Sequence, residues 1–194
     1  DLYILGFRKE DSWKQQILSM LLDSFLVAVY KDELEIRVDG INVNKANLKE
    51  IVENENLITK NLRKSIISQY LLVSEGEGVF TKTSDILGYG DIKIYVKSFS
   101  RDDSDLATGN CVMIRYPYMK IKSFNGISTM PCSAMCIIEN NKLNEKLKDI
   151  ENPQHTDWEP KRKNDESLRS EVKNVIQQMR NTIIDFVYEV LSTS

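Results

Sequence analysis

The residue types that most readily do chemistry gather between Glu151 and Pro160, where the chain's one histidine lies among acidic side chains. His155 precedes Asp157 by two residues, and a carboxylate that orients a histidine can make it a general base. However, no nucleophile or metal-ligand partner lies at a recognisable spacing from this pair. The prolines and the tryptophan of the same segment favour another interpretation, a structured corner that Trp158 holds against the rest of the protein.

Three cysteines, Cys111, Cys132 and Cys136, are odd in number and form no Cys-x-x-Cys pair. Buried thiols in a cytoplasmic protein are the ordinary interpretation of such a set. Cys132, Cys136 and His155 could also be combined into a zinc site, but a fourth ligand is missing and the spacing is poor. We therefore expect no metal ligands in this part of the protein.

Asp91 and Lys93 alternate in an apolar stretch, as a carboxylate and a lysine do in some metal-dependent nucleases. Such sites need a further carboxylate, whereas Asp91 would have to serve alone. The chain also lacks the glycine-rich loops of P-loop and dinucleotide-binding proteins and the Gly-x-Ser-x-Gly turn of serine hydrolases. Glu75-Gly-Glu-Gly78 has two glycines, but its acids would repel a phosphate, so we interpret it as a flexible turn.

Basic side chains lie on or between the predicted strands: Lys93, Lys97, Arg115, Lys120 and Lys122. If these cations converge in the fold they could bind a phosphate, because Lys and Arg form charge-assisted hydrogen bonds to its oxygens. Taken singly, each is a solvated charge on a strand face. The net charge of −3, from 26 basic and 29 acidic side chains, argues against a surface dominated by phosphate binding. It does not exclude a local basic patch or contact with nucleic acid.

The elements that must position these residues follow from the periodicity of the apolar side chains. Strands with interspersed helices predict an α+β or α/β protein, and of these we expect α+β, a mixed sheet with flanking helices. The longest apolar run, residues 21–30, is too short and too interrupted for a membrane span. We expect strands over 2–7, 34–39, 79–83, 91–97, 111–116, 119–123 and 134–138, and helices over 13–29, 45–53, 62–72, 141–150 and 166–191.

The last of these helices carries an almost unbroken apolar stripe at a spacing of three and four residues. Such a stripe is usually a docking face against the same domain, and a helix–helix contact in a homodimer is the alternative. Its members are Leu168, Val172, Val175, Met179, Ile183, Phe186 and Val190.

The order of the elements resembles one family more than any single motif does. Leu2–Phe7 is similar to the last strand of the ATP-binding domain in the gyrase, chaperone, histidine-kinase and mismatch-repair (GHKL) superfamily, and Leu21–Asp39 resembles the start of its transducer domain. In bacterial GHKL-type ATPases, several of them from anti-phage or DNA-associated systems, further segments occur in the same order. Here these are Met113–Arg115, Ala134–Ile138 and the Asn-Pro-x-His-x-x-Trp segment Asn152–Trp158.

The resemblance implies three parts: a last strand of a truncated ATP-binding domain over 1–7, a transducer-like domain over 8–160, and an amphipathic helix over 161–194. It implies that the chain, which starts at Asp1, is a piece of a longer polypeptide whose ATP-binding domain would hold ATP and Mg²⁺. We expect neither cofactor in these 194 residues alone, and no turnover by them.

In such relatives the transducer contributes a basic side chain that reaches the terminal phosphate of ATP. The resemblance implies Arg115, Lys120 and Lys122 for that role, with Lys97 behind them, although the Gln-x-Lys loop of gyrase-type relatives has no match here. The expected function is therefore coupling of ATP binding to conformational change or dimer closure. Two alternatives are a protein–protein interaction module without nucleotide and a nucleic-acid-processing domain that uses Asp91.

Overall fold

The structure, a computed structural model, describes residues 11–100 and 106–193. The strand expected over 2–7 lies outside these residues. The described elements, in chain order, are α1 (Trp13–Tyr30), β1 (Ile36–Val38), β2 (Ile41–Val43), α2 (Leu48–Glu53), α3 (Lys60–Val73), β3 (Val79–Asp85), β4 (Asp91–Ser98), β5 (Asn110–Arg115), β6 (Met119–Asn125), β7 (Cys132–Ile138), α4 (Lys142–Lys148), a single 3₁₀ turn η1 (Pro160–Arg162) and α5 (Glu166–Thr193).

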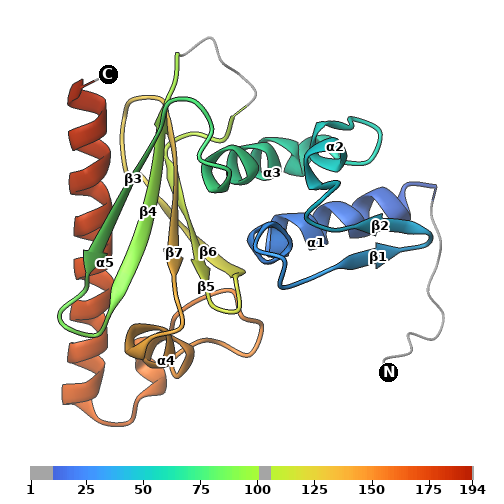
Figure 1. Cartoon of the computed structure of the whole chain (residues 1–194). Helices are drawn as coiled ribbons and strands as arrows, with labels where there is room; N and C mark the ends of the chain where they lie inside the picture. Colours follow the sequence, from blue (N-terminus) through green and yellow to red (C-terminus); the bar gives the residue numbers. More distant parts are fainter. Residues whose placement is uncertain (1–10, 101–105, 194) are drawn as a thin grey trace.

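A five-stranded sheet in the order β3-β4-β7-β5-β6 forms the centre of the molecule. Its neighbouring strands run antiparallel except β5 and β7, which are parallel. The sheet is therefore mixed, and the prediction of an α+β fold with flanking helices is confirmed. β1 and β2 form a separate antiparallel hairpin that lies with α1, α2 and α3 on one side of the sheet (Figure 1).

The two faces of the sheet are covered by different helices, α5 on one and α1 with α3 on the other (Figure 1). Because side chains alternate along a strand, Ile94 of β4 points into the α5 core and its neighbour Tyr95 into the core under α1 and α3. β7 lies in the middle, and all seven of its residues are buried. The continuous apolar run that predicted an interior strand here is thus confirmed.

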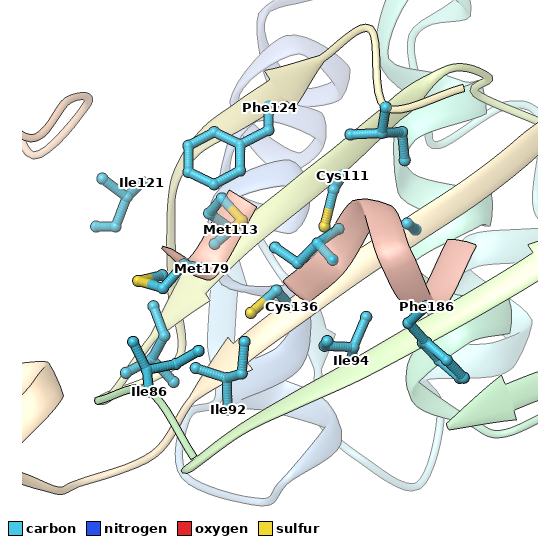
Figure 2. Packing of buried hydrophobic residues seen from close by; sticks show 14 of the residues in the cluster. Ile86, Ile92, Ile94, Cys111, Met113, Ile121, Phe124, Cys136, Met179 and Phe186 are labelled. Atoms are coloured by element: carbon cyan, nitrogen blue, oxygen red, sulfur yellow. The ribbon is translucent and has the colours of Figure 1, made fainter. Parts of the chain in front are cut away.

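The core beneath α5 holds the stripe that the sequence predicted. Met179 and Phe186 of α5 lie against Ile94, Met113 and Cys136 of the sheet (Figure 2). The interpretation of the stripe as a docking face within the domain is confirmed for all its members except Leu168, which is 44% exposed. A dimer contact through α5 stays a prediction, and it would have to use the helix's other face.

The predicted helix over 45–53 begins three residues later than expected, at Leu48. Asn44 does not cap a helix directly. Its side-chain oxygen accepts hydrogen bonds from the backbone of Ala46 and Asn47, and the Asn47 side chain accepts one from the backbone of Asn44. This closed turn delays the first helical residue, because Asn side chains compete with the helix for backbone donors.

The predicted strand over 34–39 is wrong in extent, and the sequence reasoning missed β2. Leu34 lies outside β1. Asp39 and Gly40 both have positive φ, 44° and 88°, and reverse the chain into a two-residue hairpin. An Asp-Gly pair between apolar residues is the strongest short signal for such a turn, so the hairpin could have been predicted from the sequence.

Candidate functional site

Lys120 and Lys122 lie on opposite faces of the sheet, although strict alternation along β6 would place them together. A bulge where β6 pairs with Met113 and Ile114 shifts the register between them. Lys120 reaches the layer formed by α1, α2 and α3, called the helical layer below, and forms an ion pair of 2.7 Å with Asp23 of α1. Lys122 instead pairs with Asp157 on the α5 side of the sheet. The bulge therefore divides two of the predicted phosphate-binding cations.

Arg115 at the end of β5 is only 3% exposed. Its Nε and Nη2 donate to the two carboxylate oxygens of Glu151, both at 2.5 Å, and Nη1 donates to the carbonyl of Tyr116. Burial by itself raises the pKa of Glu151, but the hydrogen bonds from Arg115 and His155 outweigh it and lower that pKa. The guanidinium thus anchors the segment after α4 to the sheet.

Lys97 lies near the end of β4 and donates from Nζ to the carbonyl of Glu77. Four residues earlier on the same strand, Lys93 pairs with the carboxylate of Glu75 at 2.6 Å. The Glu75–Gly78 turn, interpreted from the sequence as free and flexible, is therefore held to β4 by two lysines. Sequence reasoning noted that its acids would repel phosphate, and in the fold the Glu75 carboxylate and the Glu77 carbonyl bind these two lysines instead.

The predicted phosphate-binding cations do not converge on one point. Lys120 of β6 and Lys93 of β4 lie at the same level of the sheet, because Ile114 and Ile137 pair between them. Lys97 lies four residues further along β4, so it is about 13 Å along and about 14 Å across the strands from Lys120. Arg115 and Lys122 lie on the other face. In this arrangement no phosphate could touch all of them, and each has its own protein acceptor.

Three lysines that the sequence reasoning did not group do converge. A hollow of about 630 Å³ between the helical layer and the sheet receives Lys31, Lys45 and Lys93. Lys45 forms no ion pair with any described residue. No local motif marks the set, because its members come from the end of α1, the turn before α2 and β4. The other lining residues are Tyr30, Glu33, Val73, Ser74, Glu75, Tyr95 and Tyr118.

Two of these three lysines, Lys31 and Lys93, pair with carboxylates and lie over aromatic rings. Lys31 pairs with Glu139 at 3.0 Å and lies 4.4 Å above the ring of Tyr118, whose hydroxyl donates to the same carboxylate. Burial, together with Glu139, raises the pKa of Tyr118, so its hydroxyl stays a donor. Tyr118 and Glu75 also have positive φ, 68° and 51°, a conformation that L residues seldom adopt. The hollow can attract an anion, but only in competition with its own acids.

Asp23 is the polar node where the helical layer meets the sheet. Its Oδ1 accepts hydrogen bonds from Ser65 Oγ at 2.5 Å and from Gln69 Nε2 at 3.1 Å, and its Oδ2 pairs with Lys120. Ser65 and Gln69 belong to α3 and Lys120 to β6. One carboxylate of α1 therefore joins three elements, and both members of its ion pair are largely covered, at 16% and 21% exposed.

His155 does not pair with Asp157. Its Nδ1 lies 2.5 Å from the Glu151 carboxylate, and the ring is otherwise largely exposed. Asp157 instead accepts from Lys122 and from the backbone of Trp158. Trp158 is buried with its ring centroid 6.3 Å from that of Phe124. The interpretation of this segment as a corner held by tryptophan is confirmed, and the pairing assumed for a catalytic histidine is wrong.

Cys132 and Cys136 point from β7 into the core beneath α5, as Figure 2 shows for Cys136, while His155 lies in the corner after α4. Burial raises the pKa of both thiols, which keeps them protonated and poor metal ligands. Among residues 11–100 and 106–193 there is no group of three His, Cys, Asp or Glu side chains that could hold a metal ion. This leaves both the zinc interpretation and the Asp91 nuclease interpretation without ligands in the described chain.

Within the same residues, no helix has the length and apolar character needed to cross a bilayer. Neither a family model, nor a curated protein, nor a solved structure matches this chain. The resemblance to GHKL transducer domains therefore rests on the sequence segments alone, and the functional argument rests on the geometry described above.

Proposed function

We propose that this chain is a transducer-like coupling domain of a GHKL-type ATPase. It would link ATP binding in a preceding N-terminal domain, which would hold ATP and Mg²⁺, to conformational change or dimer closure. The observation that carries the proposal is the Asp23–Lys120 ion pair, because a single cation on the sheet there holds the first described helix and, through Asp23, α3. A ligand that draws Lys120 away changes what joins the two layers.

Lys120 suits a phosphate contact better than the other predicted cations. Arg115 would have to leave a buried bidentate pair, and breaking such a pair from one side costs about 3–5 kcal/mol. Lys122 pairs with Asp157 on the α5 side and Lys97 donates to the carbonyl of Glu77, so a phosphate that bound either lysine would break no ion pair between the helices and the sheet. Lys120 is 21% exposed, lies on an edge strand, and exchanges one anion for another when a phosphate replaces Asp23.

The exchange supplies a physical route for coupling. A lysine within about 3 Å of a terminal phosphate forms a charge-assisted hydrogen bond that hydrolysis removes. While Lys120 binds phosphate, Asp23 keeps only Ser65 and Gln69 of α3, so the helical layer loses its charged link to β6. Hydrolysis of one nucleotide then changes the relative energy of two arrangements of the helices on the sheet, which is the requirement for a switch.

The test is ATP hydrolysis by a protein extended at its N-terminus, compared with the present chain. We expect turnover only in the extended protein, and a fall of about tenfold or more in Lys120→Ala, because one charge-assisted contact in the transition state is lost. Lys82→Ala is the matched control, since Lys82 also joins the sheet to a helix, through Glu189, but at the opposite edge strand.

Equal turnover in the two variants would reject Lys120 as the phosphate contact. Turnover by the 194 residues alone would reject the coupling role altogether. Asp23→Asn provides a second test, because it removes the competing carboxylate and leaves Lys120 in place. We expect this variant to retain turnover. Nucleotide should, however, change the arrangement of the helical layer less than in wild type, as measured by amide hydrogen exchange in α1.

An interaction module without nucleotide remains the second candidate, and one observation favours it. Among the described strands, β3 is an edge strand that pairs only with β4, and its middle residues 80–83 are exposed. The register with β4 runs without a bulge from Val79 to Asp85. Regular, open edges accept a further strand from a partner. Absence of turnover in the extended protein would favour this function over the coupling function.

A further inference from the structure

A groove between α2 and α3, which lie beside each other in Figure 1, has a chemistry that the proposed function does not use. Its volume is about 420 Å³, within the range of small-molecule sites. Arg63, Ile67 and Leu71 line it at intervals of four residues, so they form one row along α3. Val52 of α2 faces the row. The groove is thus lined by apolar side chains together with two cations, Arg63 and Lys49, and one carboxylate, Glu53.

Arg63 lines this groove, and its guanidinium is only weakly paired there. Its Nη1 is buried and has no hydrogen-bond partner among the described residues, whereas Nη2 lies 3.3 Å from the carboxylate of Glu55. Glu55 is 81% exposed, so this is a weak pair that solvent and salt screen. A carboxylate already beside Nη2 shows which acceptor the guanidinium accommodates.

We propose that this groove binds a linear amphiphile with one carboxylate head, such as a fatty acid of medium length. The head would accept from Arg63 Nη2 in place of Glu55, and the tail would lie over Val52, Ile67 and Leu71. The row from Arg63 to Ser74 is about 16 Å long, from the helical rise of 1.5 Å per residue. Glu53 also lines the groove, which disfavours a doubly charged phosphate more than a singly charged carboxylate.

The proposal is tested by calorimetric titration of the 194-residue chain with decanoate. We expect saturable binding of decanoate, weaker binding of decanol, which lacks the charge, and none of acetate, which lacks the tail. Arg63→Gln should weaken decanoate binding by about tenfold or more, since the charge-assisted bond is lost. Lys64→Gln is the matched control, because Lys64 is the next residue of α3, is exposed, and does not line the groove.

Glu55→Gln tests whether the Glu55 carboxylate competes with the ligand for Arg63. If Glu55 competes for the guanidinium, its removal should tighten decanoate binding by about two- to threefold, a gain that damage to the fold would not produce. Ile67→Asn tests the tail site independently of charge and should weaken decanoate and decanol alike. Circular dichroism of each variant checks that it is folded.

Binding that is equal in wild type and Arg63→Gln, or equal for decanoate and decanol, would overturn the assigned head group. Absence of saturable decanoate binding by the folded wild type would overturn the site as a whole. The groove and the Asp23–Lys120 node share α3 but no residue, so these outcomes do not bear on the coupling function, and loss of coupling would not bear on the groove.

Discussion

Arg115 and Glu151 show how tertiary contacts decide the role of a charged residue. The guanidinium donates to both oxygens of the Glu151 carboxylate, which has a relative side-chain exposure of 2%, and to the carbonyl of Tyr116. His155 contacts the same carboxylate. The cation that sequence reasoning assigned to a phosphate is therefore also the link between β5 and the Trp158 corner. The phosphate role stays a prediction, and the structural role can be measured separately.

Replacing Arg115 by methionine leaves a charged carboxylate buried without its main partner. We expect Arg115→Met to lower the free energy of unfolding by about 3–5 kcal/mol, measured by urea denaturation. Lys122→Met is the control, because its ion pair with Asp157 is partly exposed and such pairs contribute about 0–1 kcal/mol. Similar losses in the two variants would show that the Arg115 pair does not anchor the corner.

Glu151 also links the stability of the protein to pH. Its pKa in the folded protein is held below the ordinary value of 4.5, so the folded state takes up its proton less readily than the unfolded state. The contribution is therefore complete above about pH 4.5 and is lost as the pH falls through the folded-state pKa. Urea denaturation at decreasing pH should show a steeper acid loss in wild type than in Glu151→Gln. Parallel curves would contradict this linkage.

At the scale of the elements, the edge strand β3 has two kinds of backbone position. Ile86 N–H donates to Gly90 O, and antiparallel pairs alternate, so Ser84 and Lys82 bond inward to β4. Thr83 and Thr81 then direct their N–H and C=O groups outward, away from the sheet. The same alternation decides which positions of β3 a partner strand could use.

Proline substitution distinguishes the two kinds of position. Thr83→Pro removes an outward N–H and should cost little, since edge strands tolerate proline there. Ser84→Pro removes a ladder hydrogen bond and should cost at least about 1 kcal/mol more in urea denaturation. If β3 is a docking edge, Thr83→Pro should also abolish association with the added strand, measured by sedimentation. The reverse order of stabilities would show that the inferred hydrogen-bonding phase is wrong.

Elements were predictable where one signal dominated. The apolar run of β7 and the stripe of α5 are long and lack competing side chains, and both were placed correctly. The start of α2 was missed because Asn44 and Asn47 bond each other's backbone before the helix begins. The bulge in β6 has no glycine or proline to announce it, so nothing local separates Lys120 from Lys122.

At the scale of the whole molecule, one sheet separates two cores. The first lies under α5 and the second under α1, α2, α3 and the β1–β2 hairpin. β7 contributes to both, with Cys136 in one and Ile137 in the other. Within the described residues, the packed strands therefore lie between the helical layer and α5. This arrangement suits a unit that transmits a difference between two states, since packed interfaces adopt discrete arrangements.

The amino-acid sequence by itself determined the class of fold, the interior position of β7 and the inward stripe of α5, because these depend on the periodicity of apolar side chains over many residues. Only the tertiary structure decided the partners of the charges. Lys120 meets Asp23 across 97 residues of chain, and Arg115 meets Glu151 across 36. Such pairings depend on strand order and on one bulge. The converging lysines and the Arg63 groove likewise exist only once distant segments have packed together.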